Sequence, residues 1–510
     1  MSISKVFSLQ LSGLKAHVIT IEIDLSNGLH AFSIVGLGDK AVDEAKDRVS
    51  AAIKNCGYTS PKQKNQKVVI SLAPAYIRKE GPSFDLGMAL AYLLASGDIE
   101  FDAQEKIFLG ELSLEGVVRK INGVLPLALG ALKYGFKEIF IPEENAEEAA
   151  LVRGIKIYPV KNLKQIIDHL TGVKDSTIQQ QKATAITPED DLLQDDFKSI
   201  RGQDAAKRAL EIAACGGHNI GMYGPPGTGK TMLAKAFQSI LPPLDYKEVL
   251  EVTGIHSVAR ILEKSSVTRP PFRSPHHTSS YISLVGGGAL PKPGEITLAH
   301  RGVLFLDEFS EFDKKAIESL RQPLEERMIT ISRAKGTLNF PAQCIVIISM
   351  NPCPCGLGKE KGCTCSDREI SSYNKKISGP IIDRIDMWVS VSKIEYEKLS
   401  KDSNDAESST SIRKRVIEAR KIQKERFKKF NIEDKKYNSE MGISEIEKII
   451  SLDKNTKNFL KESAERLGLS ARAYHRIIKL ARTIADLDTS ENISQKHVLE
   501  ALQYRQKNFN

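Results

Sequence analysis

Residues 224–231 read Gly224-Pro225-Pro226-Gly227-Thr228-Gly229-Lys230-Thr231, and this stretch decides the fold around it. It fits the pattern G-x-x-x-x-G-K-[ST], whose backbone wraps the phosphates of a nucleotide. The apolar residues 220–223 predict a strand before it, and residues 232–240 predict a helix after it. Glycines let backbone N–H groups turn toward one centre, and the helix N-terminus adds positive charge there. We expect Lys230 to reach the β- and γ-phosphates of ATP and Thr231 to hold Mg²⁺.

A second motif supplies the acidic half of the site. Residues 302–306 predict a buried strand that ends in Asp307-Glu308, the Walker B pattern. We expect Asp307 to hold the Mg²⁺ shell and Glu308 to polarise the attacking water. The alternative, a buried strand followed by a solvated acidic turn, is disfavoured by the intact phosphate loop upstream. Residues 345–350 predict another buried strand, and they end at Asn351.

Bulk composition indicates a soluble chain of several domains. Its 510 residues exceed what one core accommodates, so we expect two to four domains. A net charge of +9 permits an anionic partner such as nucleic acid without requiring one. The sequence holds no run of ~18 apolar residues and no signal-peptide h-region, so we expect a cytoplasmic protein with no membrane partner.

Patterning divides the chain into four segments. Residues 1–173 alternate strands and helices, 174–195 form a polar linker, 196–393 hold the phosphate loop, and 394–510 are helical. In the first segment we expect strands at 18–24, 31–35, 67–72 and 107–112 and helices at 40–55 and 84–96.

Four of the seven cysteines gather in an insert at 353–365, as Cys353, Cys355, Cys363 and Cys365. Two cysteine pairs at a short glycine-containing interval predict a structural Cys₄ zinc site. The C-x-C spacing is less usual than C-x₂-C, and free thiols are the alternative. Disulfides are disfavoured in a reducing cytoplasm.

Residues 196–393 resemble the core of AAA+ ATPases. The resemblance implies that Gln203 lies along the adenine and that Asn351 is sensor 1, beside the water and the γ-phosphate. An amide suits that position because it both donates and accepts hydrogen bonds. The alternative for Asn351 is a cap of the next turn.

Two arginines carry further implications of this resemblance. Residues 378–386 resemble the arginine-finger segment of magnesium-chelatase and MCM-type AAA+ proteins, so Arg384 would reach the ATP of a neighbouring subunit in a homo-hexameric ring. The alternative is a surface arginine paired with a nearby aspartate. Residues 470–482 resemble the sensor 2 helix of the AAA+ lid, so Arg472 would contact the γ-phosphate in cis, with Arg476 as the fallback.

Two insertions distinguish this chain from a generic AAA+ core. Residues 269–294 are too rich in Pro and Gly for a helix or a central strand. They resemble the pore-facing helix-2 insert of magnesium-chelatase-like proteins, which implies a substrate contact such as Arg273 on DNA. Adjacent histidines point apart in an extended chain, so we do not expect His276 and His277 to form a metal site.

Residues 326–340 contain two alternating strands around a basic, glycine-containing tip, which predicts a hairpin. MCM helicases carry a hairpin at this position before sensor 1. The resemblance implies that Arg333 and Lys335 contact DNA phosphates, and such contacts are non-specific and salt-dependent. A solvated tip is the alternative.

The first segment resembles the proteolytic domain of Lon-type ATPases, on residues 79–86 and 110–116. Ser83 occupies the position of the nucleophilic serine. Leu125 occupies the position of the lysine that activates it, and leucine cannot accept a proton. Lys120 is close in sequence, but nothing aligns it with Ser83. We therefore expect a Lon-like domain without peptidase activity, used for oligomerisation or docking.

The whole chain resembles the YifB/ComM family, often labelled magnesium-chelatase-like. The strings that carry this resemblance are Arg273-Ser274-Pro275-His276-His277, Gly286-Gly287-Gly288, residues 304–308, residues 351–356 and Ser378-Gly379-Pro380. It implies an α/β protein: a Lon-protease-like domain, a P-loop AAA+ core with helix-2 insert and pre-sensor-1 hairpin, and an all-helical C-terminal lid. The implied activity is that of a hexameric ATP-driven helicase on single-stranded or branched DNA, which promotes branch migration during natural transformation.

Other functions remain open. A magnesium-chelatase subunit would need an integrin-like domain that the chain lacks, and Leu125 opposes an ATP-dependent protease. A regulatory AAA+ ATPase that remodels a protein partner is the other alternative. The basic helix expected at 412–421 would either contact DNA backbone or form a solvated face of the lid.

Overall fold

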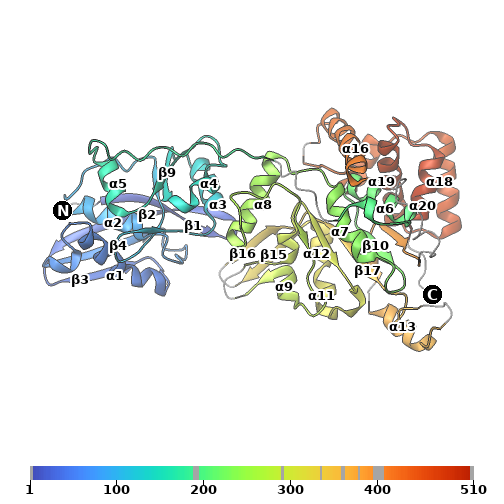
Figure 1. Ribbon diagram of the computed structural model, residues 1–510, viewed down its shortest axis with the longest axis horizontal. Helices are drawn as coiled ribbons and strands as arrows, with labels where there is room; N and C mark the ends of the chain where they lie inside the picture. The colour runs from blue at the N-terminus through green and yellow to red at the C-terminus, as the bar shows by residue number, and fades with distance from the viewer. Residues whose placement is uncertain are drawn as a thin grey trace. The chain divides into compact units, whose positions relative to one another are not determined.

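The computed structural model describes residues 4–187, 195–288, 292–333, 336–357, 362–376, 379–393, 407–432 and 434–505. The chain forms two compact units (Figure 1). The first comprises Met1–Thr187 and Tyr246–Val267, and the second comprises Pro188–Asp245 and Thr268–Asn510. Among the described residues, no helix has both the length and the apolar content needed to cross a bilayer.

A seven-stranded mixed sheet forms the first unit, in the order β3-β4-β2-β1-β5-β8-β9. Strand β2 pairs antiparallel with both β1 and β4, whereas the other neighbours run parallel. Its strands are β1 (Ser4–Ser12), β2 (Lys15–Asn27), β3 (Ala31–Val35), β4 (Gln66–Ala73), β5 (Lys106–Phe108), β8 (Glu138–Pro142) and β9 (Lys156–Val160). The helices of this unit are α1 (Lys40–Asn55), α2 (Asp85–Ala95), α3 (Val124–Lys133), α4 (Ala146–Ala149), α5 (Leu163–Leu170) and α8 (Tyr246–Ala259).

One expected strand of this unit is interrupted. Residues 107–112 were expected to form a single strand, but they divide into β5 and β6 (Glu111–Leu112), which pairs with β7 (Val118–Arg119). The break falls at Gly110, whose N–H donates to the carbonyl of Ser83 and whose carbonyl accepts from Leu86. These bonds to the segment before α2 replace the sheet ladder.

Helix α8 corrects the expected domain boundary. The sequence placed it in the segment 196–393, but Tyr246–Val267 belongs to the first unit. The Ser257 hydroxyl accepts from the N–H of Gly123 at 3.0 Å and donates to the buried Glu148 carboxylate at 2.5 Å. Because the same carboxylate accepts from the N–H of Leu125 at 2.9 Å, α8 and the start of α3 share one buried polar centre.

The second unit contains a five-stranded parallel sheet in the order β11-β14-β17-β10-β18. Its strands are β10 (Ile220–Tyr223), β11 (Phe272–Arg273), β14 (Val303–Leu306), β17 (Ile345–Met350) and β18 (Met387–Ser390). Strands β14 and β17 are buried along their whole length, which explains their nearly continuous apolar sequences. Parallel strands end at one edge of the sheet, so the residues that follow them gather there.

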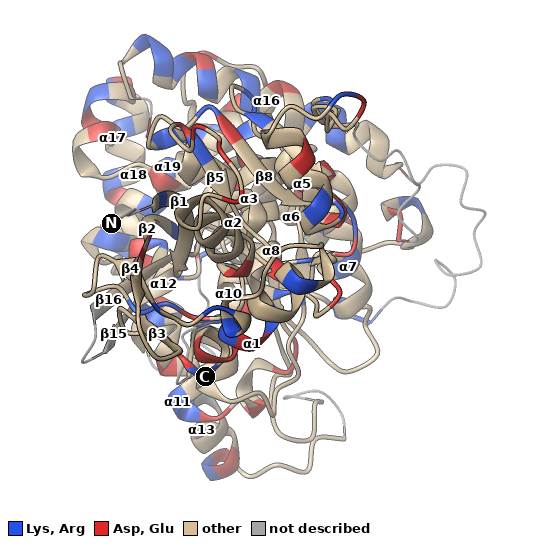
Figure 2. Cartoon of the chain, turned by 90° about the vertical axis from the view of Figure 1, so that its left-hand side faces the viewer, with Lys and Arg blue, Asp and Glu red and all other residues tan. Residues whose placement is uncertain are grey.

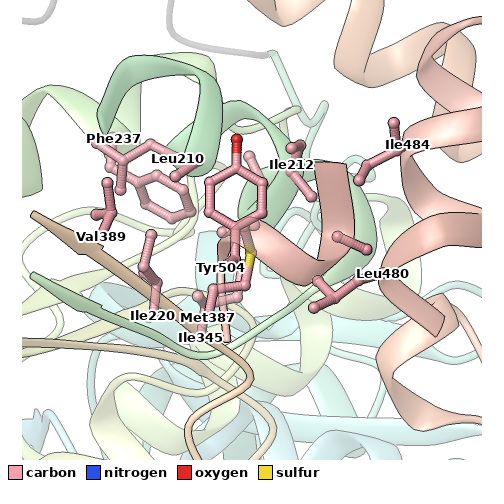
Figure 3. Packing of buried hydrophobic residues seen from close by; sticks show 14 of the residues in the cluster. Leu210, Ile212, Ile220, Phe237, Ile345, Met387, Val389, Leu480, Ile484 and Tyr504 are labelled. Atoms are coloured by element: carbon pink, nitrogen blue, oxygen red, sulfur yellow. The ribbon is translucent and has the colours of Figure 1, made fainter. Parts of the chain in front are cut away.

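The C-terminal helices and the phosphate-loop region share one hydrophobic core (Figure 3). Ile484 and Leu480 of α19 belong to the same cluster as Leu210 of α6 and Phe237 of α7. The described part of 394–510 is helical, as expected, but it packs with the sheet rather than forming a core of its own. Its helices are α16 (Ser409–Lys429), α17 (Ile443–Ile449), α18 (Lys454–Leu467), α19 (Ala471–Leu487) and α20 (Gln495–Gln503). The remaining helices of the second unit are α6 (Asp204–Gly216), α7 (Lys230–Ile240), α9 (Tyr281–Val285), α10 (Glu295–Leu298), α11 (Lys314–Ser319), α12 (Arg321–Glu326), α13 (Asp367–Lys375) and α14 (Gly379–Ile382).

The two insertions have regular structure. In 269–294, β11 lies at the edge of the sheet, where neighbouring prolines are tolerated. The segment also contains α9, capped by Ser280, and a short hairpin of β12 (Gly286–Gly287) and β13 (Lys292–Pro293), so the expectation of an irregular loop was wrong in part. The predicted hairpin is confirmed as β15 (Met328–Arg333) and β16 (Gly336–Pro341), which pair antiparallel.

Candidate functional site

Three loops meet at the carboxyl edge of the second sheet. The phosphate loop follows β10, Asp307 follows β14, and Asn351 follows β17, and these strands are neighbours in the order β14-β17-β10. Gly227 and Gly229 have φ values of 75° and 90°, so their backbone takes the left-handed form that glycine favours. This conformation turns consecutive N–H groups toward one point ahead of α7, which suits an anion.

Lys230 is buried at the centre of this arrangement. Its Nζ donates to the carbonyls of Gly224 and Pro225 at 2.7 and 2.9 Å and to Asn351 Oδ1 at 3.2 Å. Burial lowers the pKa of Lys230, while the nearby Asp307 and Glu308 carboxylates act in the opposite direction. The structure thus links Lys230 to two phosphate-loop carbonyls and to Asn351, all of which the sequence assigned to one nucleotide site.

A hydroxyl and a carboxylate form the part of the site that suits a divalent cation. Thr231 Oγ1 donates to Asp307 Oδ2 at 2.8 Å, and Ser349 Oγ bonds Asp307 Oδ1. Oxygen ligands of this kind are those that Mg²⁺ prefers. Sequence analysis missed Ser349, although it is the single polar residue of the otherwise apolar strand β17.

Glu308 has an unusual backbone conformation, and its side chain contacts a histidine. Its φ is 49°, unusual for a residue other than glycine, and its N–H donates to Asp307 Oδ1 at 3.0 Å. His277 Nδ1 lies 3.2 Å from Glu308 Oε2. The sequence assigned no specific role to His277 within the 269–294 insertion, whereas the structure joins this histidine to the candidate catalytic carboxylate. His276 instead contacts Thr278 Oγ1 at 2.9 Å.

Gln203, which the resemblance assigned to the adenine, lies beside the phosphate loop, where its side chain bonds two backbone carbonyls. Its Nε2 donates to the carbonyl of Ser392 at 2.7 Å and to that of Thr228 at 3.3 Å. The side-chain amide therefore ties the loop to the segment after β18. Gln203 immediately precedes α6, and its φ of 60° lies in the left-handed region.

Arg384 and Arg472 are brought together, but not at the phosphate loop. Both contact Glu325, and the Arg384 carbonyl accepts from Asn219 Nδ2 at 3.3 Å. Asn219 precedes β10 and the phosphate loop follows it, so a strand of four residues, about 13 Å, separates the two edges. The structure does not bring Arg472 to the nucleotide loop of its own chain, in contrast to the expected contact in cis.

Arg476, the fallback for Arg472, has a structural role. Its guanidinium donates to the carbonyl of Ile385 at 2.9 Å, bonds the carbonyl of Asp383, and lies 3.7 Å from an Asp386 oxygen. Only 14% of its side chain is exposed, compared with 49% of Arg472. Arg472 is therefore the more exposed of these two arginines.

The residues expected to touch DNA are only partly described. Arg273 in β11 forms a bidentate ion pair with Glu295, with N–O distances of 2.7 and 2.9 Å. Its guanidinium is therefore already paired within the second unit. This ion pair does not support the expected contact of Arg273 with DNA. Arg333 ends β15, but its side chain and the whole of Lys335 lie outside the described residues.

Helix α16 is rich in basic residues (Figure 2), yet several of its arginines bind their own unit. Arg413 donates to the carbonyl of Ser239, Arg415 pairs with Glu211, and Arg420 donates to the carbonyl of Ala214. These contacts attach α16 to α6 and α7. They favour the structural interpretation of this helix over a continuous DNA-binding face.

The four cysteines of the insert converge. The Sγ atoms of Cys353, Cys355, Cys363 and Cys365 all lie within 4.8 Å of one another. The separations are 3.2 Å for Cys353–Cys355, 3.9 Å for Cys353–Cys363 and 3.6 Å for Cys355–Cys363. Zinc bound by four thiolates at about 2.3 Å holds its sulfur atoms about 3.8 Å apart, so this donor set fits a tetrahedral ion.

The first unit contains Ser83, Leu125 and Lys120, which lie at or near the sequence positions of the Lon-type serine and lysine. Leu125 is fully buried at the start of α3, and Lys120 is exposed. Ser83 precedes α2, and its carbonyl accepts from Gly110. Leu125, at the sequence position of the Lon lysine, therefore packs in the core and has no group that could accept a proton.

Comparison with known proteins gives matches to three family models along the chain. The family model described as magnesium chelatase, subunit ChlI, matches residues 196–399. The models described as subunit ChlI of Mg-chelatase and as magnesium chelatase, subunit ChlI C-terminal, match residues 21–145 and 406–505. DNA replication licensing factor Mcm2 of Drosophila melanogaster is 27% identical over 254 residues, which cover 47% of this chain and 25% of Mcm2.

Two relatives match nearly the full length. Competence protein ComM of Haemophilus influenzae is 40% identical over 511 residues, which cover 99% of this chain and 98% of ComM. The uncharacterized protein YifB of Escherichia coli is 39% identical over 508 residues, which cover 99% of this chain and 97% of YifB. The chain therefore belongs to the magnesium-chelatase-like YifB/ComM family.

Proposed function

We propose that this chain is an AAA+ ATPase that hydrolyses ATP with Mg²⁺. The observation that carries the proposal is the convergence of Lys230, Thr231, Asp307 and Asn351 at one sheet edge, with Lys230 Nζ 3.2 Å from the Asn351 amide oxygen. Lys230 and the loop N–H groups neutralise the phosphates, and Asn351 orients the γ-phosphate. Glu308 takes a proton from the attacking water. Thr231 and Asp307 would hold the magnesium ion, which would supply neutralisation of the charge on the phosphates.

We further propose that the ATPase is a ring motor on single-stranded or branched DNA and promotes branch migration. The hairpin β15–β16 supports this, since β15 ends at the basic residue Arg333 and the hairpin lies directly before the Asn351 strand in sequence. Lys335, which lies outside the described residues, adds a second basic residue between the two strands in sequence. The names of two relatives, competence protein and DNA replication licensing factor, point in the same direction. A homo-hexamer is the ring we expect, because Arg384 lies away from the phosphate loop of its own chain and would complete the site of a neighbour.

DNA-dependent hydrolysis tests this proposal. ATPase activity and strand displacement are measured with forked and Holliday-junction DNA, for the wild type and for Lys230→Ala. We expect DNA to stimulate hydrolysis and Lys230→Ala to abolish both activities. Absence of DNA binding at low salt would refute the motor proposal, and an ATPase that DNA leaves unchanged would favour the alternative, remodelling of a protein partner. That alternative is supported by the matches to magnesium chelatase subunit models.

The role of the hairpin tip in DNA binding can be tested against a variant that loses the same charge elsewhere. Arg333→Ala combined with Lys335→Ala is compared with Lys457→Ala combined with Lys461→Ala, which removes two exposed charges from α18. If the tip contacts phosphates, the slope of log affinity against log salt falls by about 1.5 for single-stranded DNA in the first variant only. Equal slopes in both variants would leave the tip without a role in binding.

We also propose that the cysteine cluster holds a structural zinc ion. Its four sulfur atoms lie at separations close to those of a tetrahedral thiolate site, and Cys353 follows Asn351 by two residues. Gly356, with φ 86°, packs so closely on the phosphate loop that a Cβ there would lie 2.8 Å from Pro226. A metal-bound loop would therefore brace both Asn351 and the phosphate loop.

Metal analysis decides the zinc proposal. We expect about one zinc per purified chain, and much less in Cys355→Ser and Cys363→Ser. Cys56→Ser is the control, since Cys56 lies in the first unit. Far less than one zinc in the wild type would overturn the assignment, as would equal loss in the control.

A further inference from the structure

Two arginines from separate elements share one carboxylate in the second unit. Arg472, near the start of α19, donates from Nη2 to Glu325 Oε1 at 2.6 Å. Arg384, just after α14, bonds the other oxygen, Glu325 Oε2. Glu325 belongs to α12, so segments far apart in the sequence meet at this one side chain. Each guanidinium takes one oxygen of the carboxylate.

The cluster lies at a cavity that another molecule can reach. The cavity measures about 520 Å³. Its charged lining comprises the cations Arg327, Arg384, Arg472, Arg476 and Lys479 and the carboxylates Glu325, Asp383, Asp386 and Glu440. About half of the Glu325 and Arg472 side chains is exposed, at 48% and 49%. Arg384 Nε is buried, and within the described chain it has no hydrogen-bond partner. The guanidinium of Arg384 thus retains an unused donor.

The chemistry of the cluster is that of a phosphate site filled by a carboxylate. An ionised carboxylate between two guanidiniums offers two oxygen acceptors, as a terminal phosphate group does. The Arg384 guanidinium, with help from Arg472, lowers the pKa of Glu325, so this carboxylate is ionised at neutral pH. Its single negative charge also reduces the repulsion between the two guanidinium groups.

We propose that Glu325 is a placeholder for the terminal phosphate of ATP bound to a second copy of this chain. In a separate subunit Glu325 holds Arg384 and Arg472 together, and in the ring the phosphate of the neighbour displaces it. Glu325 is then a positioning residue, and both arginines act on the nucleotide of the neighbour. The inference rests on the proposed ATPase function. It adds that the Glu325 carboxylate competes with the phosphate of the neighbour for the two arginines.

Removal of the competing charge has a measurable consequence. Glu325→Gln keeps the size of the side chain and one acceptor oxygen, but it no longer competes as an anion. The arginines then bind the phosphate of the neighbour more readily, so assembly and hydrolysis begin at lower concentration. An exposed ion pair changes such an equilibrium by up to about fivefold.

The test measures ATPase activity of the full chain against protein and ATP concentration. Glu326→Gln is the matched control, because Glu326 accepts from Gln322 at 2.7 Å on the same helix. We expect Glu325→Gln to lower the half-saturating protein concentration and the KM for ATP by up to about fivefold. The control should match the wild type, and Glu325→Ala should shift in the same direction. Because Arg384→Ala abolishes hydrolysis, its double variant with Glu325→Gln is compared with Arg384→Ala alone by ATP-dependent assembly, where the gain should vanish.

Several outcomes would overturn the placeholder role. These are a Glu325→Gln variant that behaves like Glu326→Gln, a lower kcat without a shift in concentration dependence, or a gain that persists with Arg384→Ala. The failure of the proposed function has a different signature, since the wild type would then hydrolyse no ATP. Thermal unfolding of each variant checks that its fold is intact.

Discussion

At the scale of single residues, Glu308 is the proposed general base, and its φ of 49° is unusual for a residue other than glycine. We expect Glu308→Gln to bind ATP normally and to hydrolyse it at least about 100-fold more slowly, because an amide accepts no proton from water. Glu311→Gln, a change in the same short helix, is the control, as Glu311 pairs with Lys376 at 3.6 Å. Hydrolysis and nucleotide binding are measured separately. Parallel loss of both would assign Glu308 to binding.

His277 offers a second prediction at this scale. Its Nδ1 lies 3.2 Å from Glu308 Oε2, so it restrains the candidate base. We expect His277→Ala to raise hydrolysis without DNA and to lower the stimulation by DNA, since Glu308 then moves independently of the 269–294 insertion. His276→Ala should leave both rates near those of the wild type, because its ring contacts Thr278. The same change in both variants would contradict the restraint.

The residues of the site were predictable to different degrees. Lys230, Thr231 and Asp307 follow from local motifs, because the chemistry of a phosphate loop fixes residue types at fixed spacing. His277 and Glu325 follow from no motif. Their partners are 31 and 147 residues away in sequence, since His277 meets Glu308 and Glu325 meets Arg472 only after the chain has folded.

At the scale of elements, local periodicity predicted helix 40–55, strand 31–35 and strand 220–223 with the bounds that the structure has. Apolar side chains at helical or alternating spacing carry that information within the segment itself. The membership of α8 in the first unit depended instead on a polar centre formed by Ser257, Glu148 and Gly123. Such a contact leaves no periodic pattern, so the sequence assigned α8 to the wrong unit.

The α8 contact gives a prediction about stability. Ser257→Ala removes a donor from the buried Glu148 carboxylate and an acceptor from the N–H of Gly123. We expect a loss of about 1–3 kcal/mol in the free energy of unfolding of the first unit. Lys247→Ala on an exposed position of α8 should cost much less. Chemical denaturation of the full chain measures both variants, and equal costs would mean that the polar centre contributes little.

At the scale of the whole molecule, the C-terminal helices and the parallel sheet share one core, so α19 cannot move as an independent lid without disturbing Leu480 and Ile484. Arg472 is carried by this helix at the sheet edge away from the phosphate loop. The geometry therefore favours a site divided between two copies of the chain: the phosphate loop of one, and the arginines of the next.

Mixing two inactive variants tests this division. Lys230→Ala lacks the phosphate contact and keeps its arginines, whereas Arg384→Ala keeps the phosphate loop and lacks one arginine. If Arg384 acts in trans, an equal mixture regains roughly one quarter of the wild-type ATPase rate, the share of interfaces that pair an intact loop with an intact arginine in a ring of cyclic symmetry. Lys230→Ala mixed with Thr231→Ala should stay inactive, since both lack the loop. Arg472→Ala in place of Arg384→Ala should recover likewise. Mixed oligomers without any recovery would place the arginine in cis and contradict the divided site.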